Sequence, residues 1–568
     1  MHQGSAGLSS RRRSVRMRPR RRRSVLIAVA VLVLVIALGA AAGGYLLQRT
    51  TGSPSQTAAA YLSAWQRGAY PAMDKVSVNV PGSGLAGPLK QAAAELGVRR
   101  LRLSPGRVTT AGGSAQARFT ATAALASGHT WRYQGRLHLV SRNRHWRVSC
   151  SPAAIYPGLR PGDRFVLSTA WPARAQVLAA DGTALSSPAA TARSGSLALL
   201  TGSVVAATAA EAKKLGPQYK AGDKIGQGGI EQAYQRQLAG RPSLTIRIDG
   251  PGGRGETTAA RLPAVAGKPV RTSIDMRTQL AASRAVSSAA TAKPVDIVAI
   301  QPSTGKVVAV VERPGGFDRA LDGIFPPGST FKIVTASALV RKGLRPSSTV
   351  QCPGQVTIGG RTFHNDNNEQ LGTTTLRTAF AVSCNSTFAL LTSQRLSGAS
   401  LASMAATFGF NADPALGIPA TLGRFTTPRA PVDLAAAAFG QGKDLVNPLS
   451  QASVVAAIED GTWRPPRLVT SPAPRQAVRP RKLAAPILDT LRPMMRAVVT
   501  VGTAAGVGFP PGVYGKTGTA QYGSGPNPPS HGWFIGYRGD LAFAVLVEGG
   551  GTGADSAGPI ANAFLRKL

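Results

Sequence analysis

The pattern of apolar and polar positions divides the chain into segments of different character. Val25–Leu47 is an apolar run of 23 residues that contains no charged side chain. A helix rises 1.5 Å per residue, so a helix of this length would cross a hydrocarbon layer of ~30 Å. Gly52–Gln56 then has the composition of a linker. We therefore expect a transmembrane anchor at 25–47 behind a short tail at 1–24.

After the linker, the periodicity changes from helical to alternating. Thr57–Arg67 carries apolar residues at helical spacing, whereas Arg118–Val148 alternates between apolar and polar residues with turn residues between the runs. A helix packed on a curved antiparallel sheet that ends near Ile155 would explain both patterns. We expect an α+β domain at 53–155, and nothing in it resembles a catalytic motif.

Residues 160–265 have a weaker pattern, rich in Gly, Ala and polar turns. Two short strands are predicted there, at Arg174–Leu178 and Leu244–Ile248. Because few aromatic residues are available to build a large core, we expect an elongated, mostly-β domain that acts as a spacer.

From Val270 onward the pattern becomes regular. It predicts two hairpins and two helices, namely Asp296–Val311, Gly532–Tyr537 with Leu541–Glu548, Ser329–Lys342 and Ser556–Leu568. Strands at both ends with helices between them describe an α/β sandwich whose sheet joins the two ends of the segment. We expect this domain at 270–568.

The net charge adds information about partners. The chain carries 66 Lys and Arg against 25 Asp and Glu, a formal charge of +41. Nine arginines within residues 1–23 leave +32 on the remainder. Such a charge favours nucleic acid, an anionic membrane surface or a cell-wall polymer. Nucleic acid is not expected, because the chain has no C2H2 spacing, aromatic RNA-binding motif or phosphate loop.

The nine arginines also orient the apolar run. They lie on its N-terminal side, so the positive-inside rule keeps the tail in the cytoplasm and exports everything after Thr51. The alternative is a cleaved signal peptide, since Ala40-Ala41-Ala42 would suit a signal peptidase. The length of the apolar run favours an uncleaved, single-pass anchor.

Three cysteines, Cys150, Cys352 and Cys384, are too few for a disulfide framework. Cys352 and Cys384 fall within one expected domain, so one bridge is permissible, but free buried thiols fit equally well. No His or Cys cluster has the spacing of metal ligands, and neither a metal nor a cofactor is expected.

The candidate chemistry lies in the last domain, in three short motifs. A serine needs a nearby base to become a nucleophile, and a lysine three residues along a helix shares its face. Each motif alone is weak, because solvated helix starts, capping serines and glycine turns explain them. Their order and contexts are specific: a helix start, a loop between helices and an edge strand. The motifs are Ser329-Thr330-Phe331-Lys332, Ser383-Cys384-Asn385 and Lys516-Thr517-Gly518-Thr519.

These motifs resemble those of class B penicillin-binding proteins. The resemblance extends to Phe325-Pro326-Pro327-Gly328, Gly440-Gln441-Gly442 and His531–Gly536. Residues 160–265 resemble the family's dimerisation or pedestal domain. Residues 53–155 resemble the nuclear-transport-factor-like extension of methicillin-resistance-type proteins. The chain departs from the family's usual residues at Ala175 and Ala180 in the expected pedestal domain, and at Asn447 before Pro448-Leu449. The resemblance thus implies a multidomain chain ending in a β-lactamase-like serine transpeptidase.

The resemblance also implies a role for each motif residue. Ser329 would be the nucleophile and Lys332 its base, with Ser383 and Lys516 relaying a proton and Asn385 holding the substrate amide. The backbone N–H groups of Ser329 and Thr519 would bind the oxyanion. The strand residues Thr517, Gly518 and Thr519 would form the substrate and carboxylate site.

The implied activity is D,D-transpeptidation of peptidoglycan stem peptides ending in D-Ala-D-Ala, with β-lactams acylating the same serine. A cell-wall synthesis or division complex is compatible with it as a partner. A D,D-carboxypeptidase, a serine β-lactamase, and a non-catalytic β-lactam receptor or division scaffold are the competing interpretations. The two upstream domains favour the transpeptidase over a β-lactamase.

Overall fold

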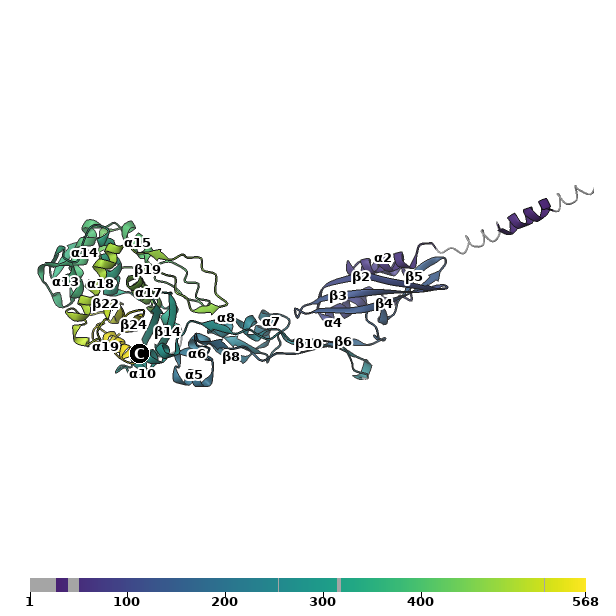
Figure 1. Ribbon diagram of the computed structural model, residues 1–568, viewed down its shortest axis with the longest axis horizontal. Helices are drawn as coiled ribbons and strands as arrows, with labels where there is room; N and C mark the ends of the chain where they lie inside the picture. The colour runs from purple at the N-terminus through teal and green to yellow at the C-terminus, as the bar shows by residue number, and fades with distance from the viewer. Residues whose placement is uncertain (1–26, 39–50, 254, 314–317, 526) are drawn as a thin grey trace, which may run out of the picture. The chain divides into compact units, whose positions relative to one another are not determined.

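The structure is a computed structural model that describes residues 27–38, 51–253, 255–313, 318–525 and 527–568 (Figure 1). Residues 27–38 form a helix whose apolar side chains are exposed. The expected anchor at 25–47 extends beyond this helix, and the expected tail at 1–24 lies entirely outside the described residues. Within the described part of the chain, no helix is both long and apolar enough to span a membrane.

The chain divides into two compact units. The first comprises Met1–Thr169 with Leu244–Leu262, and the second comprises Ala170–Ser243 with Pro263–Leu568. The expected domain boundaries near residues 160 and 265 do not coincide with these units, because two segments of the expected spacer, 160–169 and 244–262, belong to the first unit.

The first unit is built on a five-stranded sheet in the order β1-β5-β4-β3-β2. Figure 1 shows α2, Pro54–Gln66, alongside this sheet, and Trp65 packs edge-on against Phe119 at 6.0 Å between ring centroids. Ser53 begins α2 with a capping box, which explains the sharp helix start. The expected helix on an antiparallel sheet is confirmed for β2 to β5, whereas the two-residue strand β1 pairs with β5 in parallel. The other elements are α3 Tyr70–Lys75, α4 Ala86–Leu96, β1 Ser77–Val78, β2 Val98–Ala111, β3 Ser114–Leu125, β4 Thr130–Arg142 and β5 His145–Ser149.

A second sheet completes the first unit. It contains β6 Arg164–Ala170, β10 Ser243–Asp249 and β11 Thr257–Leu262 in the order β11-β10-β6. The strand predicted at Leu244–Ile248 therefore exists, but its apolar face joins the core of the first unit. Ile246 and Phe165 are buried there together with Trp131.

The expected mostly-β spacer at 160–265 is confirmed only at its two ends, which form β6, β10 and β11, and it does not hold for residues 170–243 between them. Short helices account for most of the regular structure there, because alanine-rich segments follow good N-cap residues. Ser187 caps one such helix, and Thr208 forms a capping box with Glu211 at another. The elements are β7 Val177–Leu178, α5 Pro188–Arg193, α6 Ser196–Thr201, β8 Ser203–Ala206, α7 Ala209–Leu215, β9 Lys224–Gln227, α8 Gly229–Ala233 and α9 Gln235–Ala239.

The core of the second unit is a five-stranded antiparallel sheet in the order β14-β13-β24-β23-β22. Residues from both ends of the segment build it, as expected from the two hairpins. Every residue of β24 is buried, so helices cover both faces. The bounds are β13 Val295–Gln301, β14 Lys306–Arg313, β22 Tyr514–Gln521, β23 Ser530–Tyr537, β24 Ala542–Val547, α10 Met276–Ser287, α17 Pro448–Asp460, α18 Ala485–Thr500 and α19 Ala557–Arg566.

A group of helices beside β22 completes the framework of the site. Buried α12, Lys332–Val340, is preceded by a 3-10 turn, η3, at Gly328–Phe331. The helix predicted at Ser329–Lys342 therefore exists, but its first turn is 3-10 rather than α. Helices α13, Leu376–Ala381, and α14, Asn385–Arg395, are joined by a short loop.

Candidate active site

Ser329 lies in η3, where the backbone turns tightly against β22. The preceding Gly328 has φ +54°, and a Cβ atom there would lie 2.5 Å from the carbonyl oxygen of Thr519. Glycine is therefore required for the turn to approach the strand so closely. Thr330 and Phe331 are buried, whereas Ser329 is half-buried. The turn thus presents one serine hydroxyl at the edge of the sheet.

Lys332 places its amine next to this hydroxyl. Its Nζ lies 2.9 Å from Ser329 Oγ, 2.6 Å from the carbonyl oxygen and 3.1 Å from Oγ of Ser383, and 2.6 Å from Asn385 Oδ1. A lysine amine carries at most three N–H donors, so these four oxygens compete for them. The first two motifs therefore meet at one nitrogen atom.

The surroundings of Lys332 disfavour its charged form. The side chain has no exposed surface, and burial lowers its pKa well below the ordinary value of 10.5. The positive charge of Lys516 lowers this pKa further, while Asp366 opposes the effect. A neutral amine at hydrogen-bond distance from a serine hydroxyl can accept its proton. Lys332 thus has the position and the environment of a general base.

Lys516 reaches the same cluster from the middle of β22. Its Nζ donates to Ser383 Oγ at 2.9 Å and to the carbonyl oxygen of Thr517 at 3.0 Å. Burial lowers the pKa of Lys516 to about 7. The hydroxyl of Ser383 therefore bridges two buried amines, and protons can pass between them through it.

The loop between α13 and α14 holds Ser383 in an unusual conformation. Its φ is +65°, in the left-handed region that non-glycine residues rarely adopt. The next residue, Cys384, forms a disulfide with Cys352 on β15, Thr349–Cys352. The pairing that the sequence left open is therefore present. Asn385 then begins α14, and its Nδ2 donates to the carbonyl oxygen of His364 at 3.0 Å, which orients the amide.

The third motif continues along β22, which is the edge strand of the sheet. The hydroxyl of Thr517 is 2.6 Å from that of Thr503. At Gly518 a Cβ atom would lie 2.8 Å from Thr330 Cγ2, so this glycine keeps the strand close to the nucleophile turn. Thr519 is half-buried beside that turn. The eight residues expected to carry the chemistry therefore converge on η3, the α13–α14 loop and β22.

Three contributors were missed by sequence reasoning. They are the hydroxyl of Thr503, the carbonyl oxygen of His364 and the charge of Asp366. Each comes from a segment far from the motifs in sequence and belongs to no recognisable pattern. Only tertiary contacts reveal them.

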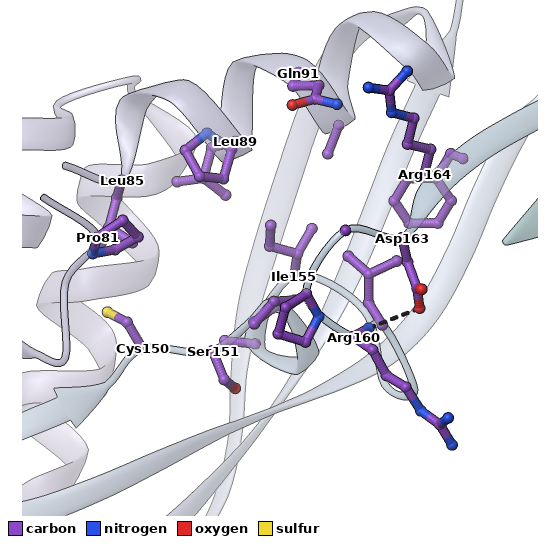
Figure 2. Close-up of a pocket in the computed structure, with 18 of the residues that line it drawn as sticks. Pro81, Leu85, Leu89, Gln91, Cys150, Ser151, Ile155, Arg160, Asp163 and Arg164 are labelled. Atoms are coloured by element: carbon purple, nitrogen blue, oxygen red, sulfur yellow. Dashed lines mark hydrogen bonds between the residues drawn. The ribbon is translucent and has the colours of Figure 1, made fainter. Parts of the chain in front are cut away.

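The first unit contains a groove of its own (Figure 2). It has a volume of about 500 Å³ and lies between α4 and residues 150–165, with walls that include Leu85, Leu89 and Ile155. Cys150 lines it, but burial raises the pKa of this thiol, which disfavours the reactive thiolate. Asp163 accepts a bond from the backbone N–H of Arg160 at 2.9 Å. The groove therefore offers no activated nucleophile.

Three domain families match the chain. The NTF2-like N-terminal transpeptidase domain matches residues 53–163, the penicillin-binding protein dimerisation domain matches 192–272, and the penicillin-binding protein transpeptidase domain matches 296–566. This succession decides the family. The chain belongs to the class B penicillin-binding proteins. Its three motifs all lie within the residues matched as the transpeptidase domain.

Named relatives and solved structures agree with this family. The peptidoglycan D,D-transpeptidase PbpA of Mycolicibacterium smegmatis is 31% identical over 331 residues, which are 47% of this chain and 66% of the relative. The match thus spans just under two thirds of that relative. Penicillin-binding protein PbpB of Mycobacterium tuberculosis is 31% identical over 225 residues, 36% of this chain and 32% of that protein. The crystal structure of Pseudomonas aeruginosa PBP2 in complex with WCK 5153 superposes with a TM-score of 0.60 at 25% identity, covering 71% of this chain and 96% of that one.

Proposed function

We propose that this penicillin-binding protein is a serine D,D-transpeptidase that cross-links peptidoglycan stem peptides and is acylated by β-lactams. The observation that carries the proposal is the buried amine of Lys332, 2.9 Å from Ser329 Oγ, with its pKa well below the ordinary value. The name of the relative PbpA, peptidoglycan D,D-transpeptidase, supports the same reaction.

In the acylation half-reaction, Ser329 Oγ gives its proton to Lys332 Nζ and attacks the carbonyl of the penultimate D-Ala. The backbone N–H groups of Ser329 and Thr519 hold the oxyanion. Removing one oxyanion donor typically costs ~10²–10³ in rate. The C–N bond then breaks, and the leaving D-Ala amine takes a proton through Ser383 and Lys516. This route is supported by the 2.9 Å bond between Lys516 Nζ and Ser383 Oγ.

Binding of the donor peptide uses the remaining residues. Asn385 holds the substrate amide, and the hydroxyls of Thr517 and Thr519 bind the terminal carboxylate together with Lys516. In the second half-reaction, the amine of a neighbouring stem peptide attacks the acyl-enzyme, loses its proton to the same amines and releases Ser329. A β-lactam enters the first half-reaction as an acylating mimic of D-Ala-D-Ala.

The experiment that tests this proposal measures transfer against hydrolysis. The purified chain is incubated with a D-Ala-D-Ala-ended peptide and an amine acceptor, and both products are quantified by mass spectrometry. We expect the cross-linked product to exceed the hydrolysed one as acceptor concentration rises. Hydrolysis alone would assign a D,D-carboxypeptidase, and absence of either product would favour a β-lactam receptor or scaffold.

We also propose that the chain is a single-pass membrane protein with a cytoplasmic N-terminus and extracytoplasmic catalytic domain. The exposed apolar side chains of residues 27–38 and the arginines before them support this orientation. The disulfide Cys352–Cys384 supports an oxidising compartment. Protease added to intact cells should then digest the catalytic domain; protection of that domain in intact cells but not in lysed ones would contradict the topology.

Partners in a cell-wall synthesis complex form part of the same proposal. A solved structure of a peptidoglycan synthase complex that coordinates polymerisation and crosslinking has a TM-score of 0.60 at 22% identity, covering 72% of this chain and 92% of that one. Such a complex would bring new glycan strands to Ser329. Co-purification of a glycan polymerase with the tagged chain would support this association.

A further inference from the structure

In the five-stranded sheet of the first unit, the segment that forms β2 to β5 carries charged side chains of positive sign only. Residues 98–149, which contain β2 to β5, include ten arginines and no aspartate, glutamate or lysine. In most folded domains, charges of both signs are interspersed on the surface. Here the segment has nothing of its own to neutralise the arginines. This composition calls for an explanation beyond the fold.

The alternation of the strands sorts these arginines by face. Along β3, residues at odd positions such as Phe119 are buried, whereas those at even positions lie on the other side, half-buried or exposed. The odd positions of β4 are likewise buried or half-buried against the cores of the unit, and its even positions face away. Helix α2 and the second sheet pack against the buried side. One face of the sheet is therefore left to solvent.

Seven arginines lie on this solvent face, which we call the arginine face. Arg118 on β3 pairs directly with Arg136 on β4. Arg102 and Arg132 flank Thr122 in a single row across three strands. Arg100 lies two residues from Arg102, and Arg147 extends the set onto β5. The members of the arginine face are Arg100, Arg102, Arg118, Arg132, Arg136, Arg142 and Arg147.

The arginine face is elongated along the strands. Arg100 is opposite Ala124 of β3, whereas the row of Arg147 crosses β3 at Ser114. Ten residues of a strand at ~3.3 Å each give a length of about 33 Å. Polar side chains such as Gln134 and Thr120, which bond each other at 3.0 Å, fill the spaces between the arginines.

The arrangement is unfavourable for the isolated unit. Like charges directly opposite on neighbouring strands, such as Arg118 and Arg136, repel each other. No ion pair involves an arginine of this face among the described residues, all of residues 98–149 being described. A bound polyanion would remove this repulsion and release its own counterions.

We propose that the arginine face is a docking surface for a linear phosphodiester polymer of the cell envelope. The planar guanidinium group binds phosphate oxygens in pairs, and a row of such groups suits a repeating anion. A lipid bilayer fits less well, because surfaces that insert into membranes carry large apolar side chains beside the basic ones, and this face carries serine, threonine and glutamine instead. The proposal is independent of the reaction catalysed in the second unit.

The test compares variants of the full chain for binding to immobilised glycerol-phosphate teichoic acid. The arginine-rich segment at residues 11–23 is common to all of them, so differences report the face. Arg102→Gln/Arg132→Gln should weaken binding roughly tenfold at low salt and reduce the slope of log affinity against log salt by about 1.5. The matched control, Arg160→Gln/Arg261→Gln, changes two exposed arginines elsewhere in the same unit and should bind as the unmodified chain does.

Two further arms separate the alternatives. Arg102→Lys/Arg132→Lys keeps the charge and should keep most of the affinity, while the circular dichroism spectrum and thermal unfolding should be unchanged in all variants and report correct folding. Equal losses in the face variant and the matched control would overturn the proposal. If the face variant instead loses affinity for phosphatidylglycerol vesicles and keeps it for teichoic acid, the face is a membrane surface and the proposal is wrong.

Discussion

Replacing Lys516 by methionine tests how the site lowers the pKa of its base. Lys332 Nζ and Lys516 Nζ bond the same Ser383 hydroxyl at 3.1 and 2.9 Å, so the two nitrogens lie no more than about 6 Å apart. At an effective dielectric constant of about 20, two unit charges at this distance repel by about 2.8 kcal/mol. This repulsion disfavours the charged form of Lys332, so the charge of Lys516 lowers the pKa of Lys332 beyond what burial does alone.

Whether the acylation rate rises or falls with pH depends on which protonation state of Lys332 is active. Lys332 accepts a proton only when neutral, so the acylation rate rises as the pH passes its pKa. Without the charge of Lys516, that pKa is higher, and the rising limb of the rate profile moves to higher pH. The full displacement applies only below pH 7, because Lys516 itself has a pKa of about 7 and loses its charge above it.

The assay is the rate of acylation by a fluorescent penicillin between pH 5.5 and 10, with the saturated rate separated from affinity. Thr517→Val is the control: it removes a hydroxyl expected to bind the carboxylate, but no charge, so it should weaken capture and leave the limb in place. If the rising limb of the rate profile of Lys516→Met stays at the original pH, or moves to lower pH, the electrostatic argument is refuted.

Three further substitutions have definite expected outcomes. Lys332→Ala should lose acylation while retaining measurable ligand affinity, and an unchanged acylation rate would exclude it as the base. Cys352→Ser/Cys384→Ser opens a loop of 32 residues and should lower the free energy of unfolding by roughly 3–4 kcal/mol in urea titrations. Gly328→Ala should reduce penicillin labelling at least tenfold, whereas Gly343→Ala, at φ +90° with open space around its Cβ, should only destabilise the fold; equal labelling in both would contradict the close-approach argument.

Local patterns correctly predicted several elements of the second unit. The hairpin at Asp296–Val311 appears as β13 and β14, and the C-terminal helix appears as α19. Alternation and helical spacing are encoded within a few residues, so the sequence specifies them directly. The first two motifs lie at helix starts that the sequence also marks, whereas the third lies inside the strand β22.

The parts that failed depend on contacts between distant segments. The strand at Leu244–Ile248 was predicted correctly, but its membership in the first unit depends on β6, more than 70 residues earlier in the chain. The left-handed conformation of Ser383 is imposed by its surroundings, since a serine has no intrinsic preference for it. Thr503 reaches Thr517 only through the folded packing of α18 against β22.

The most direct test of the account is the identity of the acylated residue. The purified chain is treated with penicillin, digested and sequenced by mass spectrometry. The account predicts a single penicilloyl adduct on Ser329, absent from the Ser329→Ala variant, whose fold should be intact by circular dichroism. An adduct on any other residue, or labelling that persists in the variant, would contradict it.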